Sequence, residues 1–155
     1  MKETDNTRSQ DATMSKSKAL KALAITFFSS GIWDTIAGIL FIFFIGRSIV
    51  PELSIHPYYA IVLGSFFLCF AYLQFLSSFN IKRYLLNVGC LIFGRIFYVV
   101  VLLAFMICLP NFPGAFWFTA IIDSVFVILY VVFALISDEV RFRDLFVPMI
   151  EETMK

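Results

Sequence analysis

The chain has a long apolar stretch near its start, residues 22–46, which reads ALAITFFSSGIWDTIAGILFIFFIG. A helix needs roughly 20 apolar residues to cross about 30 Å of hydrocarbon, and this stretch meets that requirement. Further apolar stretches follow at residues 58–79, 84–109 and 115–136. None of them shows the period-2 alternation of a membrane strand. The sequence therefore predicts an all-α membrane protein, an up-and-down bundle of four transmembrane helices.

The composition also indicates an integral membrane protein with a single domain. Hydrophobic residues make up 61% of the 155 residues and charged residues only 15%, whereas soluble domains carry about 25% charged residues. We expect a polar N-terminal tail without regular structure at 1–21, the transmembrane domain at 22–136 and an amphipathic C-terminal segment at 137–155. The lipid bilayer is the expected partner. A net charge of +1 gives no reason to expect nucleic acid.

Basic residues outside the apolar stretches fall almost entirely on one side of the predicted bundle. That side carries Lys16, Lys18, Lys21, Lys82, Arg83, Arg141 and Arg143. The opposite side has Arg47 alone. Because segments rich in Lys and Arg stay in the cytoplasm, we expect both termini to be cytoplasmic.

Familiar catalytic and metal-binding motifs are missing from the sequence. Cys69, Cys90 and Cys108 form no Cys-x-x-Cys pair, and His56 has no second His or Cys near it. There is no nucleophile elbow, phosphate-binding loop or zinc-binding helix motif. We therefore predict no metal site and no catalytic residue, and lean against an enzyme. The sequence identifies no cofactor.

Three charged residues, Asp34, Arg95 and Asp123, lie deep inside the apolar stretches. Counted from the basic side at 1.5 Å per residue, their depths are about 18, 17 and 20 Å. Each charge costs about 2.5–3.5 kcal/mol in hydrocarbon, so three at one level indicate a shared role. Both carboxylates could reach the guanidinium, which offers five donors. The sequence predicts a polar layer across the middle of the bundle.

Polar neighbours extend this layer on the same helices. Ser30 lies one turn before Asp34, Thr119 one turn before Asp123, and Tyr98 close to Arg95. The candidate ligand or proton site therefore comprises Asp34, Arg95, Asp123, Tyr98, Thr119 and Ser30. Two interpretations stay open. The cluster either fixes helix register without binding anything, or its second carboxylate is protonated, binds a cation or holds a polar ligand group.

Three local patterns carry a family resemblance: Gly31-Ile32-Trp33-Asp34-x-x-x-Gly38, Gly89-x-x-x-x-Gly94-Arg95, and Asp123 followed by aromatic residues. They resemble small bacterial four-helix membrane proteins, loosely DoxX-like. The resemblance implies an up-and-down bundle in the bacterial inner membrane. Some DoxX relatives are similar to subunits associated with quinone-linked oxidation. This chain lacks a metal, haem or cysteine-pair site, which speaks against a redox role of its own.

Three classes of function remain, in order of preference. The first is a non-enzymatic accessory subunit, working with a partner membrane subunit, or a binder of a hydrophobic lipid-like or quinone-like molecule. The second is a small proton-coupled transporter with Asp34 as the coupling acid. The third is an intramembrane enzyme that uses the paired aspartates on a hydrophobic substrate.

Overall fold

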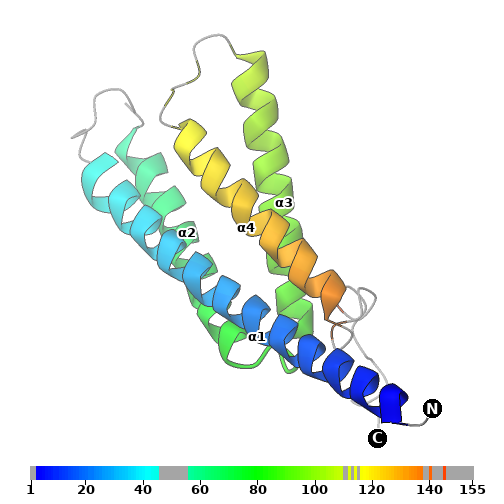
Figure 1. Cartoon of the computed structure of the whole chain (residues 1–155). Helices are drawn as coiled ribbons and strands as arrows, with labels where there is room; N and C mark the ends of the chain where they lie inside the picture. The colour runs from blue at the N-terminus through cyan, green and yellow to red at the C-terminus, as the bar shows by residue number, and fades with distance from the viewer. Residues whose placement is uncertain are drawn as a thin grey trace, which may run out of the picture.

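The computed structural model describes residues 3–45, 56–109, 112, 114, 116–137, 140 and 145, with side chains from residue 18 onward. Within these ranges the chain is helical and contains no strand (Figure 1). The helices are α1 (Glu3–Leu40), its π-helical continuation η1 (Phe41–Ile45), α2 (Pro57–Phe79), α3 (Leu85–Cys108) and α4 (Phe116–Ile136).

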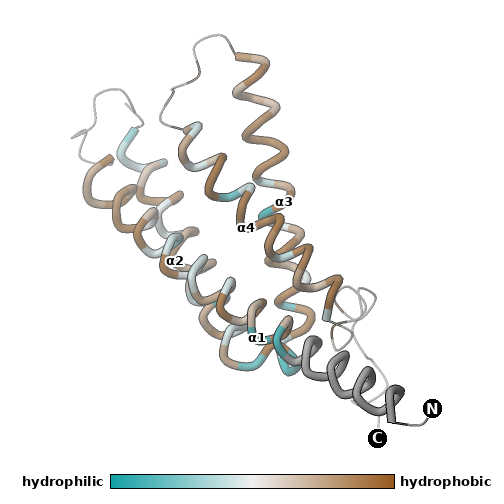
Figure 2. Tube along the Cα trace, in the orientation of Figure 1, coloured by the Kyte–Doolittle hydropathy of each residue, from teal (hydrophilic) through white to brown (hydrophobic). Residues whose placement is uncertain are grey.

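Four helical segments in the described part of the chain are long and apolar enough to cross a membrane. They are Lys18–Ile45, Pro57–Phe79, Leu85–Cys108 and Phe116–Ile136, and Figure 2 shows how strongly apolar they are. The prediction of an all-α bundle of four membrane helices is confirmed.

Helix α1 differs from its predicted bounds. It begins at Glu3 rather than near residue 22, so the expectation of an N-terminal tail without regular structure is wrong. Its first part is polar and lies beyond the apolar span that starts at Lys18. Of the predicted C-terminal segment, most residues lie outside the described part of the chain. Val140 and Leu145 are described, and both are buried against the bundle.

The turn between α2 and α3 holds these two helices together at one end. The Asn80 side chain accepts a hydrogen bond from the Arg83 backbone N–H at 3.2 Å, which shapes a short connection between antiparallel neighbours. One turn further on, the Asn87 amide donates to the Leu73 carbonyl at 3.1 Å and to the Ser77 hydroxyl at 2.6 Å. These bonds tie α3 to α2 close to the turn.

Helices α1 and α2 approach most closely at a pair of glycines. A Cβ built on Gly64 would lie 2.7 Å from the Gly38 carbonyl oxygen and 2.6 Å from a side-chain carbon of Ile42. A Cβ built on Gly38 would lie 2.9 Å from the Gly64 carbonyl oxygen. Only small residues allow membrane helices to pack at this distance. The two glycines therefore fix where the first two helices cross.

The buried core is joined at one end of the bundle and divided at the other. We call the end that carries Lys18, Lys21, Lys82 and Arg83 the basic end. Near it, all four helices contribute to one cluster, which includes Leu23 of α1, Val88 of α3 and Tyr130 of α4. Away from it, the core consists of one cluster around Phe41 and Ala60 and another around Leu102 and Ala120, and Phe116 of α4 packs against both. Figure 1 shows α3 diverging from α1 and α2 in this direction.

Replacing Gly64 with Val is expected to destabilise the bundle by about 1–3 kcal/mol, because the added carbons overfill the contact with α1. The free energy of unfolding in mixed detergent micelles, followed by circular dichroism, measures the change. Gly94→Ala is the matched control, since a Cβ at Gly94 meets no atom within 4 Å. Equal stability of both variants would contradict the assigned helix crossing.

Candidate functional site

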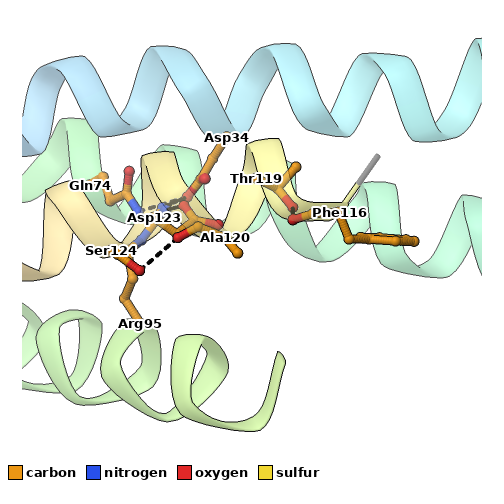
Figure 3. A network of polar contacts seen from close by, with 8 residues as sticks. All are labelled: Asp34, Gln74, Arg95, Phe116, Thr119, Ala120, Asp123 and Ser124. Carbon is orange, nitrogen blue, oxygen red and sulfur yellow. Dashed lines mark hydrogen bonds and ion pairs between the residues drawn. The ribbon is translucent and has the colours of Figure 1, made fainter. Parts of the chain in front are cut away.

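The three membrane charges meet in one buried cluster. Arg95 Nη1 donates to Asp123 Oδ1, and Arg95 Nη2 donates to Asp34 Oδ2 (Figure 3). Arg95 is 9% exposed, and the two aspartates are 2% exposed. The guanidinium thus joins α1, α3 and α4, as the depth of the three residues predicts. Each carboxylate receives a charge-assisted hydrogen bond, the strong kind for a buried site.

A fourth member, Gln74, was missed by the sequence reasoning as a site residue. Its Nε2 donates to Asp34 Oδ2 at 2.7 Å, so α2 also joins the cluster. Counted back from Phe79, Gln74 lies only about 8 Å deep, too shallow to share the level of the charges. The hydrogen bond to Asp34 shows that a residue count along α2 does not locate the amide group of Gln74.

Aromatic rings separate the charge cluster from the basic end. Arg95 lies over the Phe126 ring, with its central carbon 5.6 Å from the ring centroid. Phe126 stacks on Tyr130 at 6.3 Å, and Tyr130 stacks on Phe27 at 4.4 Å between centroids. A cation over an aromatic face gains an attraction of about 0.5–2 kcal/mol. The rings thus help to hold the guanidinium in place from the basic side.

The other predicted site residues lie around the cluster but do not bond to its charges. Thr119 donates its hydroxyl to the Phe116 carbonyl of its own helix at 2.8 Å. The Tyr98 side chain lies beside Thr119. Ser30 is fully buried near Tyr130, and neither of their hydroxyls has a hydrogen-bond partner. The Trp33 indole, not predicted as a site residue, lies beside Asp123.

A pocket of about 130 Å³ opens beside the cluster. Its wall on α2 is apolar and consists of Leu63, Phe66, Phe67 and Phe70. These side chains are only partly covered, which places them at the outer surface of the bundle as well as in the pocket. Nothing in the sequence indicates that phenylalanines line a pocket, because apolar residues of this kind also suit lipid. An engineered apolar cavity of about 150 Å³ holds benzene, so this pocket has room for a ring or a short group.

The floor of the pocket is polar and comes from all four helices. It contains Asp34, Gln74, Arg95 and Asp123, together with Tyr98. Leu91 and Gly94 complete the lining from α3. The absence of a side chain at Gly94 leaves space there, since a Cβ at this position would meet nothing within 4 Å. The pocket therefore joins an apolar outer wall to a charged floor.

Two floor residues keep oxygen atoms without hydrogen-bond partners. These atoms are Asp34 Oδ1 and Gln74 Oε1, and both are buried. A buried acceptor that lacks a partner costs about 1–3 kcal/mol, more when it is charged. Both atoms are acceptors, so each would be stabilised by a hydrogen-bond donor.

The described residues contain no group of three or more His, Cys, Asp or Glu side chains placed to hold a metal ion. No family model, curated protein or solved structure matches the chain. We therefore base the functional assignment on the geometry and charge of the pocket.

Replacing Arg95 with Met is expected to lower the free energy of unfolding by about 3–5 kcal/mol, because two buried carboxylates lose their cation. The neutral triple variant, Asp34→Asn with Arg95→Met and Asp123→Asn, should regain most of that loss, since it leaves no charge buried. Unfolding in mixed micelles measures both changes, and Arg83→Met at the exposed turn is the control. A triple variant as unstable as Arg95→Met alone would show that unpaired charge is not the cause.

Proposed function

We propose that the chain is a non-enzymatic membrane protein that binds a hydrophobic molecule in the pocket between α2 and α3, alone or as an accessory subunit. The main support for this proposal is that one pocket has both an apolar wall and a charged floor. If the cluster only fixed helix register, close packing around it on every side would stabilise it best. Here the cluster borders open space instead.

The divergence of the helices supports access from the bilayer. Asn87 ties α3 to α2 near the turn, and α3 diverges from α2 beyond it (Figure 1). Phe66 and Phe70 are exposed on the outer surface and also line the pocket. An apolar molecule can then pass from lipid into the pocket without crossing water. Its polar end would meet Arg95 and the residues bonded to it.

Transport is the second candidate, and the buried core at the basic end weighs against it. A transporter must open its site to both sides of the membrane in turn. Phe27 and Tyr130 stack between the charge cluster and that end, within the core cluster that joins all four helices. The transport hypothesis rests on the second carboxylate alone. Proton-driven uptake by proteoliposomes, abolished by Asp34→Asn, would favour it over binding.

Native mass spectrometry of the detergent-extracted protein tests the proposed binding. We expect a bound lipid-like mass on the unmodified chain and on Gly94→Ala. In Gly94→Leu the fraction of protein that carries this bound mass should fall at least tenfold, because the leucine side chain fills the pocket from α3. Ala104→Leu is the matched control, since Ala104 lies on the exposed face of the same helix. Equal retention by both leucine variants would place the ligand elsewhere and overturn the proposal.

We also propose a location in the bacterial inner membrane, with cytoplasmic termini and kinship to the DoxX-like proteins. The described basic residues Lys21, Lys82 and Arg83 lie at one end of the bundle, which the positive-inside rule assigns to the cytoplasm. Gly31, Asp34 and Gly38 of the resembling motif share the buried face of α1.

Labelling with a membrane-impermeant thiol reagent tests this orientation. Cys69, Cys90 and Cys108 are free and exposed on the bundle surface, so they are first replaced by Ser. We expect His56→Cys to react in cells whose outer membrane alone is opened, and Arg83→Cys to react only after the inner membrane is disrupted. The reverse pattern would invert the orientation.

A further inference from the structure

Two acceptor oxygens on the pocket floor have no hydrogen-bond partner, and they indicate which kind of polar group a ligand would place there. Asp34 and Gln74 are each 2% exposed, both line the pocket, and each keeps one acceptor oxygen without a partner. The two nearest donor nitrogens, Arg95 Nη2 and Gln74 Nε2, both donate to the other oxygen of Asp34, Oδ2. A donor group on a ligand would give these two oxygens the partners that they lack.

The net charge of the pocket floor also favours a ligand group with hydrogen-bond donors and a positive charge. Its ionisable groups are two carboxylates and one guanidinium, which leave one negative charge in excess when all are ionised. In the low dielectric of a membrane interior this excess favours a cation or a proton. A group that carries both a positive charge and N–H donors would neutralise the excess negative charge and also donate hydrogen bonds to the unpartnered acceptors.

From these two observations we infer that the ligand is an apolar molecule whose polar end is a primary ammonium group. The inference rests on the proposed binding function and names its ligand class. A primary ammonium has three donors and no acceptor, which matches acceptors on Asp34 and Gln74. An oxidised quinone or a carboxylate offers only acceptors, so either would leave the floor oxygens unpaired.

The size of the pocket limits what enters it. A space of about 130 Å³ takes the ammonium group and the first carbons of the chain, but not a whole lipid. The remaining chain would lie along Phe66 and Phe70, which are exposed beside the pocket. The expected ligand is thus a slender molecule, without bulky substituents next to its nitrogen.

A fluorescence experiment on the full chain in bilayers of zwitterionic lipid tests the inference. The variant Trp117→Phe leaves Trp33 as the single tryptophan, because the chain has only two. Trp33 lies beside Asp123 of the pocket floor, whereas Trp117 is half exposed. The probes are straight-chain molecules of equal length, brominated near the head, that end in a primary amine, an alcohol, a trimethylammonium or a carboxylate. Bromine quenches Trp33 when a probe occupies the pocket.

We expect the primary-amine probe to quench Trp33 fluorescence at a mole fraction in the bilayer at least tenfold lower than the carboxylate probe needs. The trimethylammonium probe should be several-fold weaker than the amine, because it has the charge but no N–H donor. Asp34→Asn should weaken amine binding at least tenfold. Gln74→Leu, which leaves no charge unpaired and so puts folding less at risk, should weaken it several-fold. Ser124→Ala is the matched control, since that hydroxyl donates within α4 to the Ala120 carbonyl at 2.7 Å.

The other outcomes separate the inference from the function on which it rests. Preferred quenching by the carboxylate or alcohol, abolished by Gly94→Leu, would overturn the ammonium assignment and keep the binding function. Equal quenching by the primary and trimethylammonium probes would overturn the role of the unpartnered oxygens. Quenching by no probe, or quenching unchanged by Gly94→Leu, would overturn the ammonium assignment and count against the pocket as well.

Discussion

The bridge from Arg95 to Asp34 and Asp123 is the constraint on which the rest of the structure depends. A charge in hydrocarbon is tolerated when it faces the interior of a bundle and has a partner. Three helices must therefore present their charged faces to one point, and this requirement sets the rotation of each helix about its axis. The small residues Ser30 and Gly38 share the buried face of α1 for the same reason. The outward faces are left to side chains that suit lipid, such as Phe97 and Ile121.

Packing alone does not explain why the cluster borders a pocket. The four helices are joined by one core cluster at the basic end, and α3 diverges from α2 beyond the charges (Figure 1). Close contact at Gly38 and Gly64 keeps α1 and α2 together as one pair. The separation leaves α2 and α3 apart at the level of Gly94, where no side chain fills the gap. A charged floor with an apolar approach is the result.

Much of the fold could be predicted from the sequence, because hydropathy and helix rise are properties of single segments. The four spans and the meeting of Asp34, Arg95 and Asp123 follow from these properties alone. Gln74 could not be placed, since its contact with Asp34 depends on how α2 packs against α1. The pocket could not be foreseen either, because it depends on the angle between α2 and α3. The sequence pattern around a phenylalanine such as Phe66 is the same whether its side chain faces lipid alone or a pocket that opens to lipid.

The separation of α2 from α3 also has a consequence for where a ligand can come from. Asn87 and the turn at Asn80–Tyr84 close the two helices against each other on the basic side of the charges. The pocket wall runs from Gln74 toward Leu63, away from that side. Its mouth therefore opens away from the basic end. The proposed ligand would then reach the charged floor from the part of the bilayer that lies away from Lys21, Lys82 and Arg83.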